Sequence, residues 1–333
     1  MSSSLASPVS QQQILYVSGN QMREALSPTA AVNALQSVLE VGLDPELDAP
    51  RTRVNTSSGL FLQMPSTWQD IVGTKLLTIT EANAAIGEPV IQGLYAIFGG
   101  ESQAPLAIID GIELTNLRTS AVSALGARLV SNSPSKELLV FGTGVQAWAH
   151  IRTFADVFGI SKVRVVGRNP ENARALIDRV STELGLDGDI GSVADVSEAD
   201  LIVCCTASSE PLFDGNQVRD HAVVVAMGAH DPTSRELDDV LLQRANVVVE
   251  SRDSAMREAG DVIQAIDSGA IRDATELLTL AEVVSGVRKP MPDRPTVFKT
   301  TGMPWQDLII ARSVLEVLHT ANALSEEALS SNA

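Results

Sequence analysis

From residue 138 onward, short continuous runs of Val, Ile and Leu alternate with segments of helical periodicity. Such runs are typical of parallel strands buried on both faces, because a strand with one solvated face alternates apolar and polar residues. Helices that connect successive parallel strands cover the two faces of the sheet. The pattern therefore predicts an α/β fold with a Rossmann-type, doubly wound parallel sheet over residues 123–303.

The first 120 residues have a different pattern, with short strand-like segments separated by Gly and Pro and spaced closely enough for hairpins. These segments are FLQMPST, IVGTKLLTIT, VIQGLYAIFGG and PLAIIDGIEL. A helix is expected to open this part, with Ser27 as its N-cap and Pro28 in its first turn. A final helix from about residue 305 has apolar positions that can return to it. We therefore expect a second, α+β domain made of residues 1–122 together with 304–333.

Composition excludes several classes of partner. The 41 acidic and 24 basic residues give a net charge of −17, which disfavours nucleic acid and anionic membranes. No apolar run approaches the roughly 18 residues that span a bilayer, and the polar segment MSSSLASPVSQQQ does not resemble a secretion signal. The adjacent Cys204 and Cys205 lie in an apolar strand and fit a reducing compartment. We expect a cytoplasmic protein, and the spacing of its histidines predicts no metal site.

The segment FGTGVQA contains a Gly142-x-Gly144-x-x-Ala147 pattern that follows a strand and opens a helix. In this context the first glycine permits a tight turn and the second lets the backbone approach a pyrophosphate. The N-terminus of the following helix supplies N–H donors to the phosphates. Gly142 and Gly144 are therefore predicted to bind a dinucleotide.

The next strand ends in VVGRNP, where NAD-selective sites usually place an acidic residue that accepts a hydrogen bond from the ribose 2′-hydroxyl. This chain has Gly167 and Arg168 there, followed by Asn169. The guanidinium and the neighbouring amide can bind a 2′-phosphate. We therefore predict a preference for NADP(H), with NAD(H) possible. The alternative is that Arg168 is a solvated surface residue.

Seven segments, spread in order from about residue 50 to 310, together resemble the ornithine cyclodeaminase/mu-crystallin family. They are APRTRVNTSSGLFLQMPS, GTKLLTITEAN, GIELTNLRTSAVSALGAR, GTGVQAWAH, ADLIVCCTASSEP, GAHDPTSREL and PTVFKTTGMPWQDL. The resemblance implies a small imino- or amino-acid substrate whose carboxylate is held by Arg51 and Lys75, with Arg118 near both cofactor and substrate. It also implies a homodimer in which N-terminal sheets pair across a two-fold axis.

The resemblance further implies a set of cofactor contacts and one additional substrate contact. The cofactor contacts are Gly144, Val145, Gln146, Thr206, Met227 and Thr300, and the substrate contact is Thr301. The alternatives are surface positions for Arg51 and Arg118 and, for Lys75, a strand lysine whose ammonium reaches solvent.

Two positions depart from the family pattern. Where ornithine cyclodeaminases have an Asp that acts on the substrate amine, this chain has His230, and Val90 stands where many members have Thr. An imidazole is a weaker partner than a carboxylate for an ammonium group, so the ornithine reaction is disfavoured. We expect His230 at the rim of the active site, with Asp231 starting a turn. Alternatively, His230 only caps that turn.

The function implied is NADPH-dependent reduction of a cyclic ketimine carboxylate. The candidate substrates are Δ1-pyrroline-2-carboxylate and Δ1-piperideine-2-carboxylate, which give L-proline and L-pipecolate. Lys75 or His230 would donate the proton to nitrogen. Alternatives are ornithine cyclodeamination, an alanine-type amino-acid dehydrogenase, or an NADPH-bound protein that only binds a small molecule.

Overall fold

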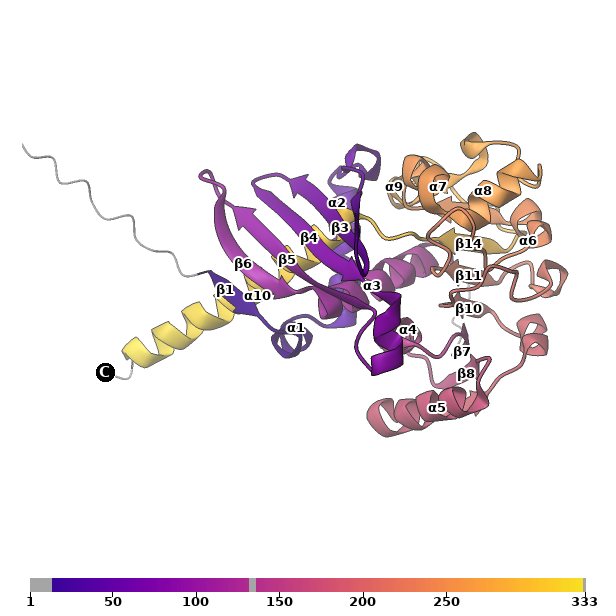
Figure 1. Ribbon diagram of the computed structural model, residues 1–333, viewed down its shortest axis with the longest axis horizontal. Coiled ribbons are helices and arrows are strands. Elements are labelled where there is room, and N and C mark those ends of the chain that lie inside the picture. The colour runs from indigo at the N-terminus through magenta and orange to yellow at the C-terminus, as the bar shows by residue number, and fades with distance from the viewer. Residues whose placement is uncertain (1–13, 132–135, 332–333) are drawn as a thin grey trace, which may run out of the picture.

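The computed structural model describes residues 14–131 and 136–331, with residues 322–331 described as backbone only. Two sheets lie at opposite ends of the molecule (Figure 1). Helix α3 lies between them, and helix α10 runs along the six-stranded sheet. The N-terminal segment on which the absence of a secretion signal was argued lies outside the described residues. Within the described part of the chain, no helix has the length and apolar character needed to cross a bilayer.

The larger sheet has eight parallel strands in the order β13-β12-β14-β11-β10-β7-β8-β9. Their bounds are β7 (Glu137–Phe141), β8 (Lys162–Val166), β9 (Asp187–Ile190), β10 (Leu201–Cys204), β11 (Val223–Ala226), β12 (Asn246–Val249), β13 (Leu278–Thr279) and β14 (Thr296–Lys299). Alternate residues enter two separate cores, so Val203 lies on one face and Ile202 on the other. The predicted doubly wound parallel sheet is confirmed.

Helices cover both faces of this sheet. They are α4 (Val145–Phe158), α5 (Pro170–Leu184), α6 (Asp239–Arg244), α7 (Arg252–Glu258), α8 (Gly260–Asp267) and α9 (Leu280–Ser285). The chain moves outward from β7 through β8 to β9, and then starts again on the other side of β7 with β10. Ligands of open α/β sheets bind at such a switch point, beyond the carboxyl ends of the strands.

The second sheet has six strands in the order β1-β6-β5-β4-β3-β2, antiparallel except for the β1–β6 pair. Their bounds are β1 (Leu15–Val17), β2 (Thr52–Thr56), β3 (Gly59–Trp68), β4 (Ile71–Ile79), β5 (Ile91–Gly99) and β6 (Ala104–Asp110). Helix α1 (Gly19–Ala25) follows β1, and α2 (Pro28–Glu40) has the predicted cap, in which Ser27 accepts a hydrogen bond from Ala30 N–H. The C-terminal helix α10 (Pro304–Ser331) packs on β3, β4 and β5, as predicted.

The segment PLAIIDGIEL was expected to be a single strand, and this was wrong. The strand β6 ends at Asp110, whose carboxylate accepts hydrogen bonds from Ile112 and Glu113 N–H and caps helix α3 (Gly111–Val130). Helix α3 packs against α2, α4, β5 and strands of the parallel sheet. The expected domain boundary between residues 122 and 123 lies inside this helix, so the division into domains stays a prediction.

Helix α3 meets the parallel sheet closely at Gly126. A Cβ at this position would lie 2.4 Å from the ring of Phe298 on β14, so a side chain there would displace the ring. The other end of α3 begins directly after β6 of the smaller sheet. One continuous helix therefore fixes how the two sheets are placed relative to each other.

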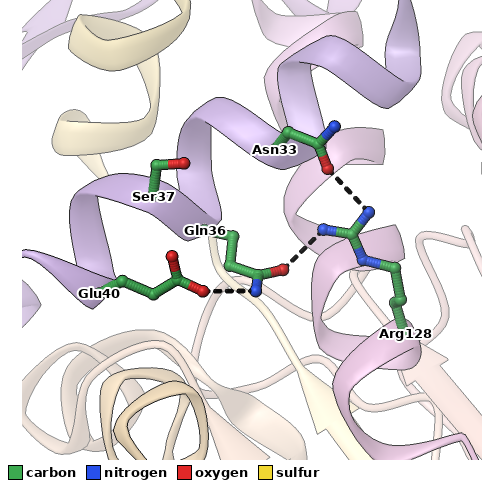
Figure 2. Close-up of a pocket in the computed structure, with 5 residues that line it drawn as sticks. All are labelled: Asn33, Gln36, Ser37, Glu40 and Arg128. Carbon is green, nitrogen blue, oxygen red and sulfur yellow. Dashed lines mark hydrogen bonds between the residues drawn. The ribbon is translucent and has the colours of Figure 1, made fainter.

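A shallow polar hollow lies between α2 and the C-terminal half of α3 (Figure 2). Within it the Arg128 guanidinium donates hydrogen bonds to the amide oxygens of Asn33, at 3.0 Å, and Gln36, at 2.7 Å. Ten residues of helix correspond to roughly 15 Å, so Arg128 lies that far along α3 from Arg118. These contacts join the two helices and belong to their packing.

Candidate active site

Strand register brings Arg51 and Lys75 to the same face of the six-stranded sheet. The register pairs Thr52 with Gln63 and Met64 with Lys75, so Arg51, one residue before β2, lies in the row of Lys75. Side chains directly across neighbouring strands share one face of a sheet. This face carries Tyr95 beside Lys75 and is the one that α10 covers.

Lys75 and Asp307 form an ion pair in which both side chains are completely buried. The Lys75 Nζ lies 3.0 Å from Oδ1 and 2.9 Å from Oδ2 of Asp307, and 3.3 Å from Oγ1 of Thr115 on α3. Arg118 joins the same carboxylate, with its Nε 3.3 Å from Oδ1. Asp307 therefore compensates two buried cations at once. Lys75 does not reach solvent, which rules out the alternative of an ordinary surface-directed strand lysine.

The charge state of Lys75 depends closely on this environment. The pKa of its ammonium is lowered to about 7, mainly by complete burial and also by the charges of Arg118 and Arg51, while Asp307 opposes the shift. A lysine with a pKa near neutrality can exchange a proton at physiological pH, which an ordinary lysine cannot do readily. The site thus contains a group suited to general acid chemistry.

Arg51 is held by partners from the other half of the molecule. Its Nη2 lies 2.9 Å from a carboxylate oxygen of Glu258 on α7 and donates to the backbone carbonyls of Thr301 and Gly302 at 3.1 and 2.6 Å. Its side chain is 10% exposed, so it is not a surface cation. A carboxylate substrate that binds Arg51 must share this guanidinium with Glu258.

The segment that follows β14 is ordered by Glu250. Its buried carboxylate accepts hydrogen bonds from Thr300 Oγ1 at 2.6 Å, from Thr301 N at 2.8 Å and from Gly302 N at 3.1 Å. Gly302 has a left-handed φ of +77°, and a Cβ there would lie 2.0 Å from a terminal nitrogen of Arg118. Thr300, Thr301 and Arg118 are thereby brought to one place, at the carboxyl end of a central strand.

The glycine motif has the geometry required for a pyrophosphate. Gly142 has a φ of +116°, and a Cβ there would lie 2.4 Å from the carbonyl oxygen of Cys205, so no side chain fits between β7 and β10. At Gly144, which precedes α4, a Cβ would meet nothing within 4 Å. The free N–H groups at the start of α4 therefore face an open approach, which fits a dinucleotide phosphate.

The remaining predicted cofactor contacts lie along the same edge of the parallel sheet. Val145 is the first residue of α4 and is exposed, and Gln146 donates to Asn116 on α3 at 3.0 Å. Thr206 and Met227 follow β10 and β11. The Thr206 hydroxyl donates to buried Glu236 at 2.7 Å, so its oxygen is left as a hydrogen-bond acceptor.

Arg168 and Asn169 lie beyond the end of β8, and both are exposed. Asn169 is the N-cap of α5: its side-chain oxygen accepts from Glu171 N–H at 2.8 Å. Its amide NH2 group is the part that can donate to an anion. Gly167 packs against Thr143, since a Cβ there would lie 2.5 Å from the Thr143 methyl group, and this brings the end of β8 next to the glycine turn.

His230 lies beyond β11 and is exposed, with Nδ1 2.8 Å from the carbonyl oxygen of Gly228. Desolvation lowers the pKa of His230, and the charges of Arg51 and Lys299 act in the same direction. Asp231 has the turn role that the sequence favoured, since it accepts from Thr233 N at 2.9 Å. His230 is thus close enough to Arg51 for electrostatic interaction, and the Gly228 contact fits the turn-capping alternative as well.

The carboxylates that organise the site were missed at the level of sequence. They are Glu236, Glu250, Glu258 and Asp307. Glu250 and Asp307 lie beside apolar runs, VVVE and DLIIA, and a buried acid needs a cation or several donors. An acid in such a context, as in PWQDLIIA, was the available signal. The residues that the structure describes contain no group of His, Cys, Asp and Glu able to hold a metal ion.

The fold and this edge define a Rossmann-type dinucleotide-binding protein with a second sheet that contributes buried cations. The model of the ornithine cyclodeaminase/mu-crystallin family matches residues 24–322, and the chain belongs to this family. The predicted resemblance is confirmed.

Two curated relatives and one solved structure are similar over most of the chain. The ketimine reductase mu-crystallin of Mus musculus is 34% identical over 248 residues, covering 74% of this chain and 76% of the relative. The Δ1-pyrroline-2-carboxylate reductase of Paracoccus denitrificans is 34% identical over 253 residues, covering 74% and 79%. The structure of Thermococcus litoralis Δ1-pyrroline-2-carboxylate reductase with NADH and L-proline is 25% identical, has a TM-score of 0.85, and covers 93% of this chain and 98% of that chain.

Gly144→Ala tests the phosphate-binding role of the glycine turn. We expect an unchanged melting temperature without ligand, because the added methyl group meets no atom within 4 Å and the φ of −86° suits alanine. We expect the Kd for NADPH and for NADH to rise at least about tenfold, because the methyl group would stand between backbone and pyrophosphate. Differential scanning fluorimetry and calorimetric titration measure the two effects. An unchanged Kd would contradict this role.

Proposed function

We propose that this protein uses a nicotinamide cofactor to reduce cyclic ketimine carboxylates, with Δ1-pyrroline-2-carboxylate as the leading substrate. The observation that carries the proposal is the cluster of Arg51, Lys75 and Arg118, three buried or nearly buried cations that meet at the carboxyl edge of the nucleotide-binding sheet. Such a cluster suits a small carboxylate. The names of its relatives support the same reaction.

In the proposed reaction the three cations have two roles. Arg51 and Arg118 bind and orient the substrate carboxylate, which places the neighbouring imine carbon in a fixed position. A bound reduced nicotinamide supplies the hydride for that carbon. Lys75 donates the proton to the imine nitrogen, and its pKa of about 7 favours it over the exposed His230 for this step. Thr301, beside the carbonyls that Arg51 contacts, is a further proposed substrate contact.

Wild-type protein is tested in two assays: NADPH oxidation with Δ1-pyrroline-2-carboxylate, and ammonia release from L-ornithine with NAD+. We expect NADPH oxidation and no ammonia, because His230 offers no carboxylate for the ornithine ammonium group. Lys75→Met should lower kcat/KM by at least about a hundredfold. Arg128→Gln changes an arginine that only joins α3 to α2, and this control should match the wild type. Ammonia release would favour a cyclodeaminase, and tight NADPH binding without turnover would favour a binding protein.

We infer a preference for NADP(H) from the exposed Arg168 and the Asn169 amide beyond β8. NAD-selective sites usually have an acidic residue there, and this chain has Gly167 and Arg168 instead. Arg168→Ala should raise the KM for NADPH by about 10- to 100-fold and leave the KM for NADH nearly unchanged, because only NADPH carries the 2′-phosphate. Arg272→Ala, which removes an exposed arginine beyond α8, is the control. An equal change for both cofactors would contradict the assignment.

We infer a homodimer formed through the face of the six-stranded sheet that α10 does not cover. On this face Leu76, Leu94 and Phe98 are half-buried or exposed and alternate with fully buried residues. A second copy of the same sheet would cover this apolar surface. Leu94→Glu should convert a dimer into a monomer in light scattering, whereas Val287→Glu, at an exposed loop position, should not. A monomeric wild type would contradict this inference.

A further inference from the structure

The contacts of the Lys75 ammonium group leave one of its three N–H donors for a ligand. One donor faces the Asp307 carboxylate, whose Oδ1 and Oδ2 lie 3.0 and 2.9 Å from Nζ, and another faces Thr115 Oγ1 at 3.3 Å. The Thr115 hydroxyl proton is directed to the Gly111 carbonyl at 2.7 Å, so its oxygen can only accept from Lys75. An ammonium held by two acceptors has a fixed orientation, and the direction of its third N–H is fixed with it.

Among the residues that the structure describes, the other groups around Lys75 offer no strong acceptor for that third donor. Arg118 on α3 and Arg51 before β2 are cations, which donate and do not accept. Tyr95 on β5 is buried in the adjacent strand position, and desolvation raises the pKa of its phenol, so it stays neutral. Asp48 accepts a hydrogen bond from Trp305 N–H at the start of α10, and its charge interacts with Asp307 and Tyr95. The substrate is therefore the natural partner of the third N–H.

We propose that Asp307 and Thr115 are positioning residues that hold Lys75 as an ammonium and direct its remaining N–H to the imine nitrogen. This inference rests on the proposed function. In the step concerned, the Nζ–H bond breaks, a new N–H bond forms at the imine nitrogen as the C=N electron pair moves there, and Lys75 is left as a neutral amine. The proton consumed in each turnover is taken up from water, and it must reach the buried amine before the next turnover. Asp307 provides the charge that favours the ammonium, and Thr115 provides the direction.

The roles of Asp307 and Thr115 can be tested separately with variants of similar shape. Asp307→Asn removes the carboxylate that contacts Lys75 and leaves Arg118 beside it, so the pKa of Lys75 should fall by about one unit or more. Lys75 is protonated below its pKa, and reduction needs the protonated form. The limb of kcat/KM that falls as pH rises above about 7 in the wild type should therefore move to lower pH by the same amount. Asp307→Glu keeps the charge and should keep the limb near its wild-type position.

Thr115→Val removes the acceptor and keeps the shape. We expect kcat to fall about tenfold with a smaller pKa change, because the ammonium stays charged but loses its fixed direction. Thr115→Ser should restore most of the rate. Thr119→Val is the matched control: one turn further along α3, its hydroxyl donates to the Thr115 carbonyl at 2.6 Å. It should behave as the wild type.

The pKa of Lys75 is measured directly by NMR titration of protein labelled with 13C at the lysine ε-carbon, with Lys75→Met to assign the signal. This measurement needs no substrate, so it does not depend on the proposed function. A wild type without imine turnover would overturn the proposed function but not the measured effect of Asp307 on the pKa of Lys75. A Lys75 pKa unchanged in Asp307→Asn would overturn the role of Asp307. A kcat for Thr115→Val equal to that of Thr119→Val would overturn the role of Thr115.

Discussion

The buried ion pair between Lys75 and Asp307 is the interaction on which the rest of the structure depends. It joins β4 to α10 across 232 residues, and neither side chain has any exposure. Removing an unpaired charge from water costs several kcal/mol, so each residue stabilises the other at its buried position. The C-terminal helix must therefore return to the N-terminal sheet, and its first turn must face the row of strand residues that contains Lys75.

A short connection between β14 and α10 links this ion pair to the nucleotide-binding edge. Glu250 fixes Thr300 to Gly302, Arg51 donates to two carbonyls of the same segment, and Arg118 packs on Gly302. Helix α3 acts in parallel, because it contributes Arg118 and Thr115 and also packs on Phe298. The distance between the cation cluster and the dinucleotide turn is therefore set by packed backbone.

Local features could be predicted from the sequence, whereas features that depend on distant partners could not. The turn at Gly142 and Gly144 needs only a strand before it and a helix after it, and both are visible as patterns. Lys75 was identified through family resemblance, but nothing near it in sequence indicates Asp307. Helix α3 was missed as a helix because it is buried on nearly all sides, with Ser120 and Ser123 inside, so its apolar residues show no single face.

The central claim is that an imine held by this cation cluster accepts a hydride at the carbon next to its carboxylate. The most direct measurement follows the hydride itself, with stereospecifically 4-deuterated NADPH, Δ1-pyrroline-2-carboxylate and mass spectrometry of the product. The account predicts proline with one deuterium at the α-carbon from one of the two labelled cofactors, and unlabelled proline from the other. Unlabelled proline from both cofactors, or no proline, would contradict it.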